Sequence, residues 1–237
     1  MPTRHELTVS GERLVAVHHE APTDDWIIFC HGFQSDKSGS YKSRCERAVE
    51  EGFNGVRFDF RGCGESSRQF HEQTLSSRLA DLAAIIEFFD PPSYVLFGSS
   101  FGGKVAFHHD GDDRCRAIVT RAPVTDTRTF DKYRDDGTNG LDRGGGANGT
   151  ESIVGEFFED LDQYPFADVT NGIDVPVAIF HGRDDESVPI EDSIQAVDSL
   201  DTDVMLQSYA GEGHLFSRRA EARLRDQCFD WLEATVA

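Results

Sequence analysis

Residues 94–103 are Tyr94-Val95-Leu96-Phe97-Gly98-Ser99-Ser100-Phe101-Gly102-Gly103, and they place a serine between a predicted strand and a predicted helix. The apolar run 94–97 favours a buried strand, and a helix is expected from 101. Glycines two residues before and after Ser100 let neighbouring backbone approach without a Cβ clash. Ser99 lacks this spacing, because its corresponding neighbours are phenylalanines. The pattern G-x-S-x-G in this setting predicts that Ser100 is a catalytic nucleophile.

Strands and helices are expected to alternate on both sides of this turn. Alternating residues around Ser10-Gly11 predict a hairpin over 6–19. Further strands are expected at 26–30, 55–60, 94–97, 115–121, 175–180 and 203–209, and helices at 41–51, 74–89, from 101, near 190–200 and at 217–234. This order predicts an α/β protein with a mostly parallel eight-stranded sheet and helices on both faces, in a single domain of residues 1–237.

Residues 124–172 interrupt the alternation and predict a cap or lid insertion, since a loop of this length is rarely idle in a compact domain. A short apolar helix is expected over 153–158, and Gly144-Gly145-Gly146 suggests local mobility. Two interpretations of the aromatic residues here stay open. They either line the wall of a substrate pocket or pack a small core of the insertion itself: Phe130, Tyr133, Phe157, Phe158 and Tyr164.

A serine nucleophile needs a base and an acid. His214, just past the last expected strand, is the candidate base, whereas His181 is expected to be structural and His108 to be solvated. Two neighbouring aspartates, Asp184 and Asp185, compete for the role of the acid. The chain order serine, aspartate, histidine fits a strand–turn–helix serine hydrolase.

Several motifs together identify a family resemblance. They are His31-Gly32-Phe33, Asp59-Phe60-Arg61-Gly62-Cys63-Gly64-Glu65-Ser66, the turn at Ser100, H-G-x-x-D-x-x-V-P from His181 and G-x-G-H ending at His214. The chain resembles the α/β-hydrolases over nearly its whole length. It is most similar to small carboxylesterases of the cinnamoyl/feruloyl esterase type and to related monoacylglycerol lipase and serine aminopeptidase-like hydrolases.

The resemblance implies roles for particular residues. In this family the acid lies four residues after the histidine of H-G-x-x-D, which selects Asp185. The fold supplies two backbone N–H groups to an oxyanion hole, and these correspond to Phe33 and Phe101. His31 is expected to shape its loop, and Asp59 and Arg61 are expected to form a loop-shaping ion pair.

The implied activity is serine-dependent hydrolysis of a small-molecule carboxylic ester through an acyl-enzyme, with no cofactor and no metal. A peptidase or thioesterase of the same fold is the alternative, because the same machinery attacks ester, thioester and activated amide carbonyls. A catalytically silent binding protein of this fold is disfavoured, since a complete set of site residues is present. The sequence does not name the substrate or the oligomeric state.

The net charge of the chain favours some partners and environments and disfavours others. The chain has 43 Asp and Glu against 23 Lys and Arg, of which only 4 are Lys, for a net charge of −20. Such a surface disfavours nucleic acid as a partner. An acidic, Lys-poor surface also favours a halophilic protein, because carboxylates hold water and molar salt screens their repulsion. The alternative is an ordinary acidic cytosolic protein.

The expected location is the cytoplasm. No stretch approaches the ~18–20 apolar residues that span a bilayer, and Met1-Pro2-Thr3-Arg4 begins no apolar signal core. The 5 cysteines are scattered without a C-x-x-C pair. This pattern favours free thiols in a reducing compartment over disulfides or a zinc site.

Overall fold

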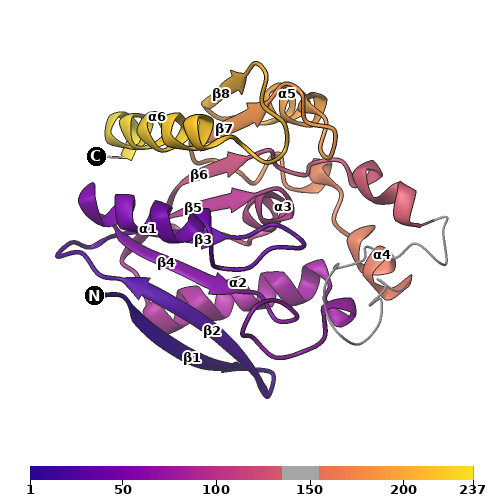
Figure 1. The fold of residues 1–237 in the computed structure, drawn as a ribbon. Coiled ribbons are helices and arrows are strands. Elements are labelled where there is room, and N and C mark those ends of the chain that lie inside the picture. The colour runs from indigo at the N-terminus through magenta and orange to yellow at the C-terminus, as the bar shows by residue number, and fades with distance from the viewer. Residues whose placement is uncertain (135–154, 237) are drawn as a thin grey trace.

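One sheet of eight strands runs through the chain, of which the computed structural model describes residues 1–134 and 155–236 (Figure 1). The strand order is β1-β2-β4-β3-β5-β6-β7-β8. Strand β2 pairs antiparallel with β1 and β4, and every other pair is parallel. The strands are β1 (Thr3–Val9), β2 (Glu12–His19), β3 (Asp25–Cys30), β4 (Asn54–Asp59), β5 (Ser93–Ser99), β6 (Cys115–Arg121), β7 (Val177–Gly182) and β8 (Val204–Tyr209). The predicted α/β class and mostly parallel sheet are confirmed.

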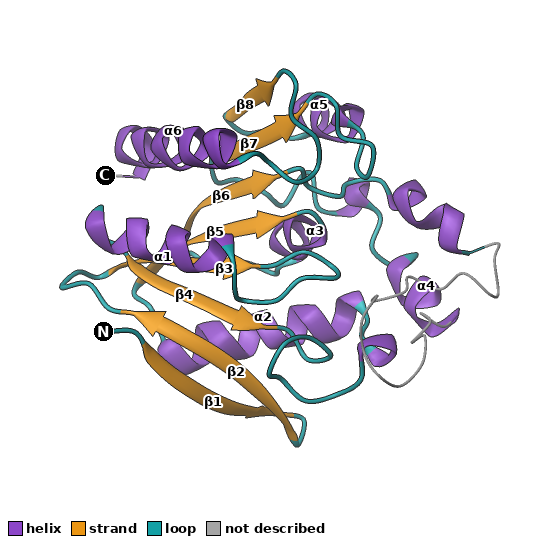
Figure 2. Cartoon of the chain, in the orientation of Figure 1, coloured by secondary structure: helices purple, strands orange, loops and turns teal. Residues whose placement is uncertain are grey.

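Helices cover both faces of the sheet (Figure 2). On one side lie α1 (Ser40–Glu50) and α6 (Arg218–Val236), and on the other lie α2 (Leu75–Phe89), α3 (Phe101–His108) and α5 (Ile190–Ser199). A short 3-10 helix, η1 (Phe70–Glu72), precedes α2. None of the helices in the described ranges is long and apolar enough to cross a membrane.

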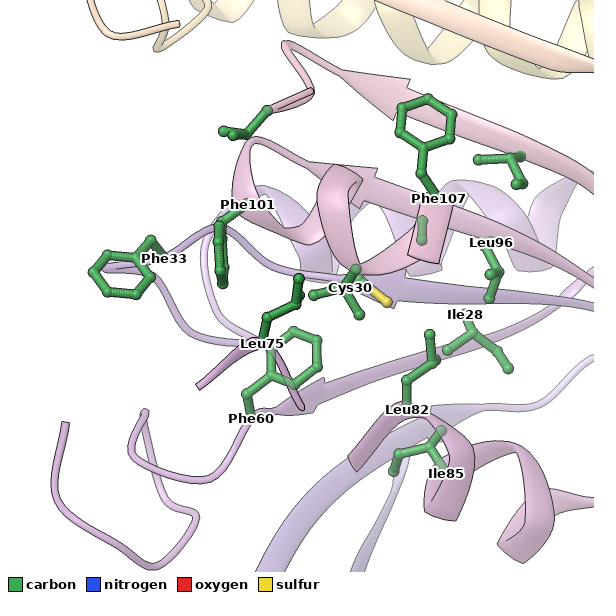
Figure 3. Packing of buried hydrophobic residues seen from close by; sticks show 14 of the residues in the cluster. Ile28, Cys30, Phe33, Phe60, Leu75, Leu82, Ile85, Leu96, Phe101 and Phe107 are labelled. Atoms are coloured by element: carbon green, nitrogen blue, oxygen red, sulfur yellow. The ribbon is translucent and has the colours of Figure 1, made fainter. Parts of the chain in front are cut away.

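The continuous apolar run in β3 reflects burial on both faces. Ile28 and Cys30 belong to the cluster packed against α2 and α3, whereas Ile27 and Phe29 belong to the cluster packed against α1 and α6. Figure 3 shows the first cluster, where Leu82 of α2 approaches the β3 side chains. A parallel strand covered on both faces needs no polar alternation. This packing fixes the end of β3, where the site begins.

The structure shifts the boundaries of some elements. The hairpin turns at Ser10 and Gly11, whose φ angles of 51° and 82° suit a tight two-residue turn. Strand β7 begins at Val177 although the apolar run starts at 175, because Pro176 has no N–H for the ladder. Strand β5 continues through Ser99 and so ends directly at the predicted nucleophile.

Within the described ranges, three short helices lie between β6 and β7, beyond the carboxyl ends of the parallel strands (Figure 1). They are η2 (Thr127–Tyr133), α4 (Gly155–Leu161) and η3 (Phe166–Asp168). The helix expected over 153–158 corresponds to α4 from Gly155 onwards, and Ile153 and Val154 lie outside the described residues. The glycine run 144–146 also lies outside them.

Helix α3 forms hydrogen bonds to the chain between α4 and η3, on the way back to β7. The Lys104 Nζ donates to the Tyr164 carbonyl at 2.6 Å, and His108 Nε2 lies 3.0 Å from the same oxygen. His108 is therefore buried and not solvated, because the returning chain covers it. The expectation that His108 is solvated was wrong. The residue that covers its ring lies more than 50 positions further along the chain, where no local sequence pattern indicates the contact.

Candidate active site

Ser100 lies between β5 and α3 in a backbone conformation that is rare for a residue with a side chain. Its φ is 54° and its ψ is −119°. The Ser100 N–H donates to the Arg121 carbonyl at 2.9 Å, and its carbonyl accepts from Gly103 at 2.9 Å and Val124 at 3.2 Å. These bonds hold the strained turn in place. Strain of this kind clusters at active sites.

The glycines around Ser100 are required by contact with other backbone. A Cβ at Gly98 would lie 2.3 Å from the Gly102 carbonyl oxygen, and a Cβ at Gly102 would lie 2.2 Å from the Cys30 carbonyl oxygen. Ser99 has another environment, because its fully buried Oγ accepts a hydrogen bond from Arg44 Nη1 at 3.1 Å. Of the two adjacent serines, Ser99 is committed to a buried contact with α1.

His214 and Asp185 come together from two loops that follow β8 and β7. The distance from His214 Nδ1 to Asp185 Oδ2 is 2.8 Å. Asp185 Oδ1 accepts the backbone N–H groups of Ser187 at 2.8 Å and Val188 at 2.9 Å. Asp184 is exposed, and its side chain makes no hydrogen bond within the described ranges. The structure therefore brings Asp185, and not Asp184, to His214.

The environment of Asp185 favours its ionised form. Burial by itself would raise the pKa of this carboxyl group. Hydrogen bonds from His181, His214 and the Val188 amide outweigh burial and hold the pKa of Asp185 well below its ordinary value. A carboxylate held in this way can fix the tautomer of the histidine ring beside it.

His181 is a buried structural residue, as its position in the sequence suggests. Its Nδ1 lies 2.6 Å from Ser193 Oγ, its Nε2 lies 3.0 Å from the Val188 carbonyl oxygen, and the ring is fully buried. Because a carbonyl oxygen only accepts, the proton is on Nε2 and the serine hydroxyl donates to Nδ1. His181 thus fixes the loop that presents Asp185.

The loop after β3 lies against the Ser100 turn. A Cβ at Gly32 would be 3.4 Å from Ser100 Cβ. His31 shapes this loop, since its Nδ1 lies 2.7 Å from the Gly32 carbonyl oxygen and its Nε2 accepts the Phe60 N–H at 3.1 Å. Within the described residues, the N–H groups of Phe33 and Phe101 have no hydrogen-bond acceptor.

Arg78 of α2 supports the same loop, a role that the sequence pattern alone did not predict. Its Nη2 donates to the Phe33 carbonyl at 2.9 Å, and its Nη1 lies 3.3 Å from the His31 carbonyl oxygen. The guanidinium is fully buried and lies 5.5 Å from the Phe33 ring centre and 5.2 Å from that of Phe101. Its position on the apolar face of the helix, three residues after Leu75, was the available signal.

The expected ion pair between Asp59 and Arg61 does not form. Asp59 Oδ2 accepts from Lys37 Nζ at 2.5 Å, and Arg61 Nε donates to Asp81 Oδ1 at 2.5 Å. Asp59 is the last residue of β4, whereas Arg61 lies in the turn that follows, so the two side chains meet different partners. Each still anchors a loop, and Lys37 also binds Glu65. The loop-shaping role of the motif was right and the pairing was wrong.

A cavity of about 450 Å³ joins these elements at the carboxyl ends of the strands. Ser100 and His214 both lie on its wall. Its remaining lining residues are Gly32, Phe33, Gln34, Ser35, Tyr41, Arg121, Val124, Thr129, Phe130, Tyr133, Ser187, Val188 and Leu215. A larger cavity of about 720 Å³ opens near the start of β6 and includes none of the predicted catalytic residues. Among the described residues, no three or more His, Cys, Asp and Glu side chains gather as metal ligands would.

The structure places the aromatic residues between β6 and β7 on the cavity wall or in the main core. Phe130 and Tyr133 line the cavity. Phe157 instead packs against Phe33, with ring centres 5.1 Å apart, and belongs to the main core together with Phe158. Figure 3 shows Phe33 and Phe101 side by side at the edge of this core. Among the described residues of 124–172, the apolar side chains join the core of the sheet and form no separate core.

The family model that matches this chain is that of the prolyl oligopeptidase family, over residues 40–237. A mitochondrial palmitoyl-protein thioesterase from Pongo abelii is 25% identical over 214 residues, which cover 84% of this chain and 69% of the thioesterase. A bifunctional esterase/perhydrolase from Acinetobacter calcoaceticus is 26% identical over 238 residues, covering 81% of this chain and 86% of that enzyme.

Solved structures agree with the fold. Est1E from Butyrivibrio proteoclasticus, with ferulic acid bound, superposes with a TM-score of 0.84 at 20% identity, covering 98% of this chain and 99% of Est1E. The predicted α/β-hydrolase fold is confirmed. The relatives are hydrolases of the esterase and thioesterase type, which confirms the resemblance and the class of enzyme expected from the sequence.

Proposed function

Because the chain belongs to the prolyl oligopeptidase family, we propose that it is a serine hydrolase that cleaves carboxylic esters with a triad of Ser100, His214 and Asp185. The observation that carries the proposal is the 2.8 Å contact between His214 Nδ1 and Asp185 Oδ2, beside a cavity whose wall includes both His214 and Ser100. The strained conformation of Ser100 supports the same assignment.

In the proposed reaction, Ser100 Oγ attacks the ester carbonyl while His214 Nε2 takes its proton. His214 then gives this proton to the oxygen of the leaving alcohol as the carbon–oxygen bond breaks, which leaves an acyl-enzyme on Ser100. Water repeats the sequence and releases the acid. Asp185 stays ionised throughout and stabilises the imidazolium, in keeping with the lowered pKa of its carboxyl group.

The oxyanion of each tetrahedral intermediate would be held by the N–H groups of Phe33 and Phe101. Both N–H groups lack an acceptor among the described residues, and the Gly32 contact places the Phe33 loop beside the nucleophile. One such donor accounts for about 10²–10³ in kcat in serine hydrolases. No metal or cofactor takes part in the proposed steps.

Thioester hydrolysis is the second candidate, because a relative 25% identical to the chain is named a palmitoyl-protein thioesterase. Peptide hydrolysis is the third, favoured by the name of the family. The same triad attacks all three carbonyl types, so a substrate panel decides between them. The panel comprises p-nitrophenyl and methyl hydroxycinnamate esters, aminoacyl anilides and acyl-CoA thioesters. A silent binding protein would turn over none of them.

A fluorophosphonate probe tests the nucleophile. We expect the probe to label Ser100, and Ser100→Ala to lose both labelling and ester turnover by about 10⁴–10⁶-fold. Ser99→Ala is the matched control, because it removes the adjacent hydroxyl and should keep the label. Full esterase activity in Ser100→Ala would refute the assignment.

We also propose that residues 124–172 form a cap insertion of a single domain, 1–237, and govern substrate selectivity. The support is local: Thr129, Phe130 and Tyr133 of η2 lie on the cavity wall together with Ser100. The acyl or alcohol group of an ester would therefore contact side chains of this segment.

The charge of −20 and the small number of lysines support a further proposal, that the enzyme works in a cytoplasm of high salt content. All 5 cysteines are free and buried, in agreement with a reducing compartment. Burial raises the pKa of the Cys30 and Cys228 thiols to about 12, so neither forms a reactive thiolate near neutral pH.

A further inference from the structure

Arg121 is a charged side chain in the wall of the active-site cavity that the proposed chemistry does not use. It is the last residue of β6, and its carbonyl accepts the N–H of Ser100 at 2.9 Å. Its side chain contributes to the cavity lining and is only 9% exposed. A cationic side chain is thus held, largely out of water, in the wall of the cavity that also includes the predicted nucleophile.

The hydrogen bonds of Arg121 leave two nitrogens of its guanidinium without a partner among the described residues. Its Nη1 donates to the His214 carbonyl, and its Cζ lies 5.5 Å from the centre of the Phe216 ring. The buried Nε has no hydrogen-bond partner. Across the described residues, Nη2 also makes no hydrogen bond, and no carboxylate lies within 4.0 Å of the group.

The nearby carboxylates are already engaged. Glu221 accepts from Arg44 Nε at 2.7 Å and from Arg44 Nη2 at 3.0 Å. Asp185 is bound by His214 and by two backbone N–H groups. Arg44 therefore has a bidentate carboxylate partner, whereas Arg121, which lies on the cavity, has none within the described part of the chain.

An unpaired guanidinium in a buried position is costly, and proteins normally pair such groups. The Nε and Nη2 donors of one arginine are arranged to bind both oxygens of a carboxylate in parallel. The two unpaired donors therefore have the geometry of a carboxylate site. Because it lies in the same cavity as Ser100 and His214, the missing partner would enter with the substrate.

Resting on the esterase function proposed above, we infer that Arg121 binds a carboxylate group of the substrate, so that the preferred substrates are esters that also carry a free carboxylate. A surface with a net charge of −20 repels such an anion. A fixed cation inside the cavity would compensate for this repulsion at the point where the ester is cleaved. Molar salt would weaken the long-range repulsion far more than the buried contact.

Matched pairs of esters test the inference. p-Nitrophenyl butyrate and p-nitrophenyl hydrogen glutarate differ by a carboxylate on the acyl side, and phenyl butyrate and 3-carboxyphenyl butyrate differ by one on the alcohol side. In at least one pair we expect the ratio of kcat/KM, carboxylated over neutral, to exceed one. Arg121→Gln should lower that ratio by about 10–100-fold, the range expected for a charge-assisted hydrogen bond.

Two variants separate recognition from support of the histidine loop. Both esters of a pair should lose some rate in Arg121→Gln, because Arg121 also binds the His214 carbonyl. Arg121→Lys keeps the charge without the planar donor edge and should give an intermediate ratio. Arg116→Gln removes the same charge from an exposed site on the same strand and should leave the ratio unchanged.

Failure of this inference can be told apart from failure of the esterase proposal. Equal losses for both esters of each pair in Arg121→Gln would overturn the carboxylate site and leave the esterase proposal intact. If no ester is hydrolysed, the carboxylate site can still be tested by binding. Calorimetry then compares the dissociation constant of p-nitrophenyl hydrogen glutarate for Ser100→Ala with that for the double variant Ser100→Ala/Arg121→Gln. Binding at least ten times weaker in the double variant supports the site, and equal binding overturns it.

Discussion

Replacement of Arg78 by methionine tests whether a buried guanidinium positions the loop of residues 31–33. The change keeps the length of the side chain and removes its charge and donors. The Phe33 carbonyl oxygen would lose the Arg78 Nη2 donor at 2.9 Å. The Gln73 side-chain oxygen would lose the Arg78 Nη2 and Nε donors at 2.5 and 2.9 Å. Each buried acceptor left unpaired costs about 1–3 kcal/mol. With relief of the buried charge set against this cost, we expect the free energy of unfolding to fall by about 2–4 kcal/mol.

The effect of Arg78→Met on catalysis should exceed its effect on binding. The variant displaces the Phe33 N–H without deleting it, so the loss should lie below the 10²–10³ of a deleted oxyanion donor. We expect kcat to fall by about 10–100-fold, with KM within about threefold of the wild-type value. Stopped-flow or steady-state assays with a p-nitrophenyl ester, corrected for the folded fraction from urea unfolding, measure both.

Leu82→Ala is the matched control for the loss of stability. Leu82 is fully buried one turn further along α2, and its truncation should cost about 2–5 kcal/mol through a cavity in the core. Its kcat per folded molecule should stay close to that of the wild type. If Arg78→Met and Leu82→Ala have the same kcat after this correction, Arg78 is a stabilising residue only and the positioning argument fails.

Four further outcomes are expected. Asp185→Asn should lower kcat by roughly 10⁴, whereas Asp184→Asn should be close to wild type in the same ester assay; the reverse ranking would move the acid to Asp184. Phe130→Ala should reduce kcat/KM for a hydroxycinnamate ester about tenfold more than for an acetate ester, since it removes apolar cavity wall, and equal losses would deny it a role in selectivity. Burial lowers the pKa of Lys104 to about 8 from 10.5. Between these pH values the unfolded chain binds one more proton than the folded protein, so the free energy of unfolding should rise with pH. Urea unfolding at pH 8 and pH 10 should show this rise, and the rise should be smaller in Lys104→Met. Melting temperature and activity should increase from 0.1 M towards molar KCl, as the Debye length falls from about 10 to about 3 Å. A maximum of both at 0.1 M would contradict adaptation to high salt and identify an ordinary acidic protein.

Local patterns were sufficient for the fold and for the turn at Ser100. The apolar runs and the glycine spacing around Ser100 depend only on neighbouring residues, so the strand, the turn and the helix could be placed from them. The choice of Asp185 over Asp184 came from the motif spacing of a family, and from the residues alone it stayed open. The structure brings Asp185 within hydrogen-bond distance of a histidine 29 residues away.

Partners of buried charges could not be predicted in the same way. Arg78 binds a carbonyl 45 residues earlier, and Arg61 pairs with Asp81 rather than with the nearby Asp59. Such contacts depend on how helices and loops meet after folding, and no pattern along one element encodes them. A polar residue on an apolar helix face, as at Arg78, is the clue that a buried partner exists, although it does not say which one.

The contact of α3 with the chain returning from the insertion has a consequence for how this enzyme can change over evolutionary time. Lys104 and His108 form hydrogen bonds to the main-chain carbonyl oxygen of Tyr164, so the attachment does not depend on the side chain at that position. The proposed cap can therefore exchange its side chains, and with them the shape of the cavity at Ser100, while it stays attached to the helix that begins directly after Ser100. Selectivity and chemistry are in this way free to diverge at different rates within one small protein.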